Sequence, residues 1–177
     1  GGGNAEFFDA EVEKVIVPDG TKVIPDKMFL GIHAAGFEVA DSLEYIGEAA
    51  FYLSDVLEMD VDFPNLKHIG KVAFMKTSVR DVVLHDKLEY IGDGAFLYVP
   101  TLRNITIDCD FFGLGSFYSF YSVFSTTSRD LYYQEQQRDK STFGDVVFTE
   151  KSIAPPNRIA AFVYLTFNSF DFSNAKW

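Results

Sequence analysis

The sequence predicts a β-rich α/β-solenoid: a right-handed spiral of about five coils, each 22–23 residues long, that share one parallel β-sheet. The first observation is a six-residue motif, here called the phrase, that ends in Phe and recurs in register. Its copies are Ile24–Phe29, Ile46–Phe51, Ile69–Phe74 and Ile91–Phe96, and the closing Phe returns after 22, 23 and 22 residues. A period of this length is typical of coils that cannot bury their apolar faces alone and therefore stack on one another.

The second observation is an apolar triplet at positions i, i+3 and i+5 ahead of each phrase. Its last two members are two residues apart, so they share one face of a short strand and the residue between them points the other way. A further apolar residue follows at Leu43, Leu66 and Leu88, with Thr21 a weaker occupant of the slot. The triplets are Val12/Val15/Val17, Ala34/Phe37/Val39, Val56/Met59/Val61, Val79/Val82/Leu84 and Leu102/Ile105/Ile107.

The Phe of each coil is expected to stack on its neighbours as an aromatic ladder. A fifth, degraded phrase ends at Phe117, so the predicted repeat core is Phe29, Phe51, Phe74, Phe96 and Phe117. Gly follows the Ile of the phrase at positions 47, 70 and 92, where the chain turns a corner. Glycine suits such a corner because it tolerates either a positive φ or a close backbone approach.

The combined pattern V-x-[VIL]-x-x-x-L-x-x-I-G-x-x-A-F resembles the BspA-like leucine-rich repeats of bacterial surface proteins and some protozoan ones. The resemblance covers residues 12–117 and implies a surface or secreted protein, with a bacterial outer surface favoured. That family usually has Cys three residues after the Phe, and here the slot holds Ile32, Ser54, Thr77 and Val99. A ladder of cysteines is therefore not expected.

The repeats divide the chain into three parts. Residues 1–11 are expected to be a tether or a remnant, 12–117 the repeats, and 118–177 an aromatic-rich C-terminal cap. Within and just before that cap, residues 117–124, 145–149 and 160–167 have the β-branched and aromatic composition of strands. Residues 131–138 are a short helix or part of a long loop. The region is interpreted as a β-rich cap over the last coil, with a binding face of exposed aromatics as the alternative.

Charge and length exclude several classes of partner. The formal net charge is −11 and the pI is near 4.6, which argues against nucleic acid and anionic membrane surfaces as partners. No apolar run reaches the ~20 residues of a membrane span. Gly1–Gly3 reads either as a cloning remnant or as the spacer after a lipid-modified Cys, so a lipid anchor upstream of Gly1 stays open.

The residues give little support for catalysis. None of the three histidines, at 33, 68 and 85, has a second His or Cys at metal-ligand spacing, and no nucleophile elbow, phosphate loop or dinucleotide fingerprint is present. Cys109 lies two residues beyond Ile107, so alternation turns it inward as an inert thiol. We therefore predict no enzyme activity, no cofactor and no metal.

The outward positions of the predicted strands form an acidic stripe. Its structural interpretation is a solvated face that keeps a parallel sheet soluble. Its functional interpretation is a docking face for a basic protein ligand, with charges that steer association; a calcium site is the weaker alternative. The candidate face consists of Glu38, Glu58, Asp60, Asp62, Asp81, Val83, His85, Thr106 and Asp108.

The sequence thus favours a non-enzymatic, adhesin-like module that binds a protein at a cell surface. Two alternatives remain at this point. One is a carbohydrate-binding module that uses C-terminal aromatics such as Tyr132 and Tyr133 as sugar platforms. The other is a purely structural segment of a larger surface protein.

Overall fold

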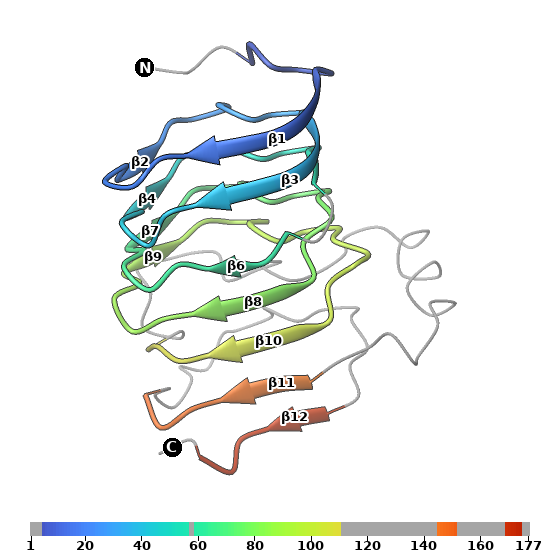
Figure 1. The fold of residues 1–177 in the computed structure, drawn as a ribbon. Coiled ribbons are helices and arrows are strands. Elements are labelled where there is room, and N and C mark those ends of the chain that lie inside the picture. Colours follow the sequence, from blue (N-terminus) through green and yellow to red (C-terminus); the bar gives the residue numbers. More distant parts are fainter. Residues whose placement is uncertain (1–4, 57–58, 111–144, 152–168, 175–177) are drawn as a thin grey trace.

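The computed structural model of the chain describes residues 5–56, 59–110, 145–151 and 169–174. Every strand pairing among them is parallel, and successive strands stack one above another as rungs of a spiral (Figure 1). The described ranges contain strands and turns and no helix. The predicted parallel-sheet solenoid is therefore confirmed.

The strands of the described residues form three sheets. The first is β1 (Glu11–Val17), β3 (His33–Val39) and β5 (Asp55–Val56). The second, in spatial order, is β6 (Val61–Asp62), β8 (Asp81–Leu84), β10 (Asn104–Ile107), β11 (Asp145–Phe148) and β12 (Ser169–Asp171). The third, along the corner of the spiral, is β2 (Val23–Ile24), β4 (Tyr45–Ile46), β7 (His68–Ile69) and β9 (Tyr90–Ile91). The corner sheet marks four coils, and the second sheet extends beyond them through β11 and β12.

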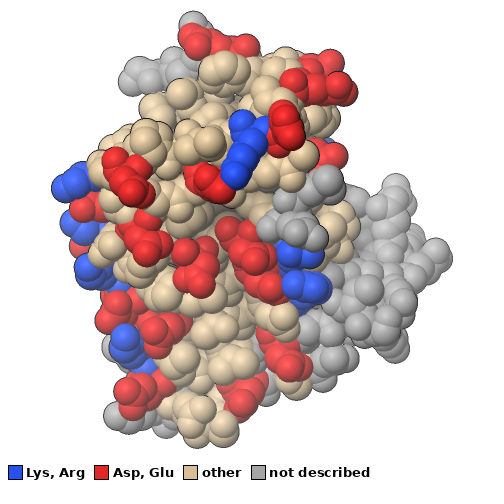
Figure 2. Space-filling model, in the orientation of Figure 1, with Lys and Arg blue, Asp and Glu red and all other residues tan. Residues whose placement is uncertain are grey.

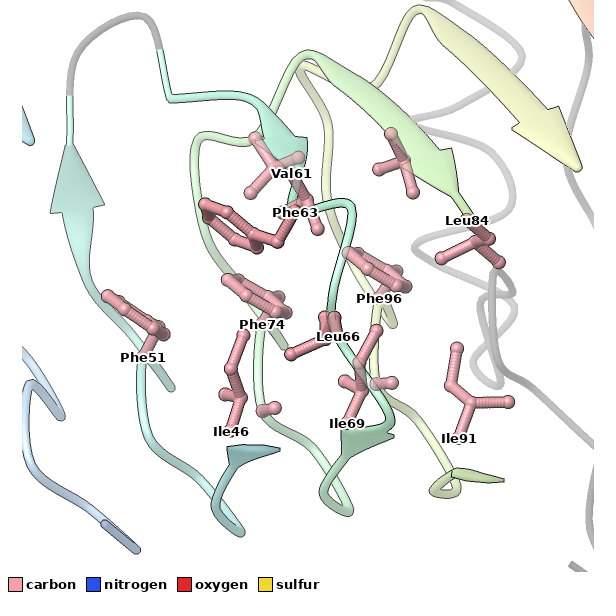
Figure 3. Packing of buried hydrophobic residues seen from close by; sticks show 14 of the residues in the cluster. Ile46, Phe51, Val61, Phe63, Leu66, Ile69, Phe74, Leu84, Ile91 and Phe96 are labelled. Carbon is pink, nitrogen blue, oxygen red and sulfur yellow. The ribbon is translucent and has the colours of Figure 1, made fainter. Parts of the chain in front are cut away.

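The core lies between the long-strand sheets and the turns that follow the corner. The rings of Phe51, Phe74 and Phe96 stack in one row, with centroids 5.0 and 5.2 Å apart, above a parallel row of isoleucines that includes Ile69 (Figure 3). Phe29 continues the ring row at 5.4 Å from Phe51. All four rings are buried, which confirms the predicted aromatic ladder at these positions. Phe117 lies outside the described residues.

The corner positions require glycine because the backbones of adjacent coils approach each other closely there. A Cβ on Gly70 would lie 2.5 Å from the backbone nitrogen of Glu48, and one on Gly47 or Gly92 would meet the coil before it as closely. No real Cβ tolerates such contacts, so only glycine lets adjacent coils stack here. The left-handed backbone falls two residues later, at a slot filled by Ala49 and Val72 among others.

One detail of the predicted register is wrong. The triplets align Val61 with Leu84, whereas Val61 pairs with Val82 in the structure. Val61 precedes the corner Ile69 by eight residues, whereas its partner Val82 precedes Ile91 by nine, and Phe63 is buried. Because the observed register differs from the predicted one by two residues, each side chain stays on the predicted face of the sheet. The neighbours across the face nevertheless change, and Asp60 rather than Glu58 comes to lie beside Asp81.

The two ends of the described chain continue the spiral. Residues 5–10, within the range expected to be a tether, form a turn in which the Asp9 amide donates to the Gly31 carbonyl, and the Phe7 ring stacks on Phe29. At the other end, β11 coincides with the strand expected at 145–149 and pairs in parallel with β10. The expected strands at 117–124 and 160–167, and the expected helix or loop at 131–138, lie outside the described residues.

Candidate functional site

The second sheet presents a broad outward face, which we call the acidic face and define as the outward side chains of β6, β8, β10, β11 and β12 with the residues that flank those strands. Strand pairing arranges it in three rows that run across the rungs. The central row is Asp62, Val83, Thr106, Val147 and Asp171. One flanking row is Asp60, Asp81, Asn104, Asp145 and Ser169, and the other contains His85, Asp108 and Thr149.

The middle of the central row is apolar or β-branched and its surroundings are charged. Val83, Thr106 and Val147 are each half-buried and lie side by side on β8, β10 and β11. In Figure 2 uncharged surface runs down the lower part of this face, with acidic side chains on both sides of it. The repeat therefore builds a flat uncharged strip bordered by carboxylates.

The flanking row that contains Asp81 is a hydrogen-bonded ladder. The Asp81 amide donates to Asp60 Oδ1 at 3.2 Å, Asn104 Nδ2 donates to Asp81 Oδ1 at 2.9 Å, and the Asp145 amide donates to Asn104 Oδ1 at 3.0 Å. Ser169 Oγ extends the ladder to Asp145 Oδ1 at 2.7 Å. These bonds fix the outward side chains of adjacent rungs relative to one another.

Asp81 is the most strongly held carboxylate of the face. Partial burial disfavours its charged form, but hydrogen bonds from Arg103 and Asn104 and the charge of Arg103 outweigh burial and lower the pKa of Asp81. Arg103 approaches its other oxygen at 2.9 Å. Asp81 is therefore a structural anion and less suited to contact a partner.

The remaining predicted residues differ in how their charge is compensated. His85 Nε2 lies 2.5 Å from Asp62 Oδ1, and Asp108 accepts a hydrogen bond from Thr149 Oγ1 at 2.6 Å. Lys151 Nζ lies 3.5 Å from Asp108 and 3.0 Å from Asp86, which ties the end of β11 to the two coils before it. The partners reduce the negative charge of the face without cancelling it.

Two predicted residues stand apart from this group. Glu38 lies on β3, in the first sheet, and its carboxylate forms an ion pair with Lys14 of β1. Glu58 lies outside the described residues, as do Tyr132 and Tyr133. The structure thus brings together Asp60, Asp62, Asp81, Val83, His85, Thr106 and Asp108 on one sheet.

The sequence reasoning missed the part of the face built by β11 and β12. The signal was present, because Asp145-Val146-Val147-Phe148 repeats the pattern of Asp81-Val82-Val83-Leu84. It went unused because residue 145 lies well beyond one period from Asn104, so the next rung was sought too early. Asp145, Val147, Thr149 and Asp171 belong to the candidate face.

The described residues provide no evident metal site or reactive nucleophile. No group of three or more His, Cys, Asp or Glu residues among them could hold a metal ion. Cys109 is buried, as predicted, and burial together with the charges of Asp110, Asp108 and Asp86 raises the pKa of its thiol to about 12. No helix long and apolar enough to cross a membrane occurs in the part of the chain that the structure describes.

Comparisons with known proteins identify the repeat. No curated protein matches the sequence. Among solved structures, a leucine rich cell surface protein from Faecalibacterium prausnitzii matches with 14% identity and a TM-score of 0.36, over 93% of this chain and 61% of that one. The family model of the BspA type leucine rich repeat region matches residues 3–127 in six copies. The chain therefore belongs to the BspA-type leucine-rich-repeat family.

Proposed function

We propose that the chain is a non-enzymatic protein-binding module of a surface or secreted protein, and that it binds its ligand on the acidic face. The observation that supports this most directly is the strip Val83–Thr106–Val147, which lies in register across three rungs, with Asp81 and Asp145 on one side and Asp108 on the other. An uncharged centre with a polar rim is the usual anatomy of a protein interface. Family membership supports a surface location and a protein ligand.

The charge of the face favours a basic ligand. Around the strip, Asp60, Asp62, Asp145 and Asp171 contribute carboxylates, and two cations beside the face, Arg103 and Lys151, are each paired with an aspartate. Like charges across an interface cost several kcal/mol, and opposite charges accelerate encounter. A ligand with a basic patch is therefore expected to associate faster at low salt.

The test uses a panel of purified extracellular proteins, with binding followed by biolayer interferometry. The face variant combines Asp145→Asn and Asp171→Asn, which keep an acceptor oxygen at each position. Asp81 is left intact because Arg103 depends on it. The matched control combines Glu48→Gln and Glu89→Gln, two exposed carboxylates on the turn and corner of the spiral.

For a ligand of this face, the double Asn variant should associate several-fold more slowly and show a flatter dependence on salt, while the control behaves as wild type. A second variant, Thr106→Lys, places a bulky cation in the strip and should abolish binding. A ligand whose kinetics respond to the control and not to the face variants would contradict the proposal.

A further inference from the structure

A hollow of about 480 Å³ opens on the same side of the molecule where the first and second sheets part. We call it the sheet-break hollow. Its lining comes from β1, β3 and the segment around β6, and includes Lys14, Gly36, Glu38, Asp60, Asp62 and Phe63.

The hollow lies beside β3, beyond the described pairing of that strand with the third coil. Among the described residues, β3 pairs with that coil at His33–Asp55 and Ala34–Val56, whereas β1 pairs with β3 through Val17–Val39. β6 pairs with β8 on its other side. Among the described strands, the second half of β3 therefore has a partner on one side and the hollow on the other. A backbone edge of this kind is a template for an added extended segment.

Gly36 lies in the middle of β3 on the wall of the hollow, and the fold does not require a glycine there. A Cβ at Gly36 would have only Lys14 Cγ, at 3.6 Å, within ordinary contact distance, and the residue has no positive φ. The corner glycines differ, since a Cβ there would overlap the backbone of the next coil. Glycine inside a strand weakens it, and often marks a place where a ligand or another backbone approaches closely.

The chemistry of the hollow matches a cation with an apolar stem. Met59 and Phe63 are buried and Phe37 is half-buried, and these side chains supply apolar surface. Three carboxylates, Glu38, Asp60 and Asp62, line the hollow with one cation, Lys14, which is paired with Glu38. An excess of negative charge beside apolar surface suits a cationic side chain that buries its methylenes and keeps its charged head at the opening.

We propose that the sheet-break hollow receives an arginine side chain from an extended segment of a basic protein partner, which lies along the second half of β3. The proposal rests on the proposed function and specifies its partner. Arginine fits better than lysine because Asp60 and Asp62 lie two residues apart on one face, about 6.5–7 Å along the strand, and a planar guanidinium with five donors can reach two acceptors at once. Gly36 leaves room for that side chain.

The test measures binding of a minimal probe, N-acetyl-arginine amide, to the full 177-residue chain by titration of amide NMR signals. N-acetyl-citrulline amide is the matched neutral probe, since it has nearly the same shape without the charge. Arginine amide should shift the signals of Gly36, Glu38 and Asp60 in a saturable way, and citrulline amide should not. Equal shifts with both probes, or equal binding of N-acetyl-lysine amide, would overturn the assignment.

Two variants separate shape from charge. Gly36→Val fills the hollow without changing any charge, and Asp60→Asn removes one charge without filling it. Asp60→Asn should weaken arginine-amide binding at least about fivefold, since hydrogen bonds to charged groups contribute roughly that much or more. Gly36→Val should weaken it at least as much, because the valine side chain occupies the space that the arginine needs. Gly36→Ala adds one methyl group and should retain most of the binding, and Glu89→Gln on the corner is the charge control. A thermal melt of Gly36→Val verifies folding.

The outcomes distinguish this proposal from the proposed function. If the probe instead shifts Val83, Thr106 and Val147, the hollow proposal fails while the acidic face stands. If Gly36→Val leaves the affinity for a protein ligand unchanged and Thr106→Lys abolishes it, the hollow is not part of the interface. If the probe binds in the hollow and the face variants leave the binding of a protein ligand unchanged, the hollow proposal is supported and the acidic-face proposal fails.

Discussion

The rings of Phe74 and Phe96 lie face to face, with centroids 5.2 Å apart and ring planes 1° from parallel. Phe51 covers the other face of Phe74 at 5.0 Å, so the ring is enclosed by the coils on both sides and fully buried. Phe74→Ala should lower the free energy of unfolding by about 3–5 kcal/mol, because neighbouring coils cannot both move into the cavity.

Chemical denaturation measures this loss. The control is Phe8→Ala, since the Phe8 side chain is 58% exposed and its removal should cost less than about 1 kcal/mol. A Phe74 variant as stable as the control would show that the ring row does not hold the coils together.

Cys109 should be almost unreactive in the folded protein. Its thiol is buried, and a pKa of about 12 leaves very little of the reactive thiolate near neutral pH. Labelling with a thiol reagent should be slow in native buffer and fast in denaturant. Rapid labelling of the native protein would mean that the end of β10 opens easily.

Ser54 occupies the slot that holds Cys in related repeats, and its buried Oγ has no hydrogen-bond partner among the described residues. Ser54→Ala should therefore raise the free energy of unfolding by about 1 kcal/mol, since it removes an unpaired buried hydroxyl. Thr77, one coil later in the same slot, donates to the Phe74 carbonyl at 2.7 Å, so Thr77→Val should be destabilising. Denaturant titrations of both variants test the contrast, and a less stable Ser54→Ala would refute it.

Most of the fold was predictable because one period fixes many positions at once. The Ile and Phe of each phrase, such as Ile69 and Phe74, occupy buried slots whose spacing alone implies stacked coils. The 23-residue spacing shows that the third coil is one residue longer than its neighbours, but it does not show how that coil aligns with the next one. In the structure Val61 lies opposite Val82 and Phe63 is buried, an alignment that a list of apolar positions does not contain.

The candidate site was less predictable than the fold. Alternation placed Asp81, Val83 and Thr106 outward correctly, because a period of two survives a two-residue slip. It did not reveal that Arg103 holds Asp81, nor that a hollow opens beside Gly36. Both features depend on which rungs become neighbours, and that depends on the length of each coil.

His68 should make stability depend on pH. Its ring lies between Tyr45, at 4.2 Å, and Tyr90, at 4.5 Å, and burial lowers its pKa from the ordinary value although the charge of Asp26 opposes the shift. The unfolded state therefore binds the proton more readily than the folded state. This contribution to stability is fully present above the unfolded pKa of about 6.5 and is lost as the pH falls through the folded pKa.

The measurement compares the wild type with His68→Phe, which keeps an aromatic ring in the stack and cannot titrate. Between about pH 7.5 and about pH 5, the wild type should lose more stability than the variant. Asp81 also has a lowered pKa, but its contribution is lost only near and below the ordinary pKa of a carboxyl group, about 4, so the two effects occupy different pH ranges. Equal losses for the two proteins across the histidine range would show that the stack does not exclude the protonated ring.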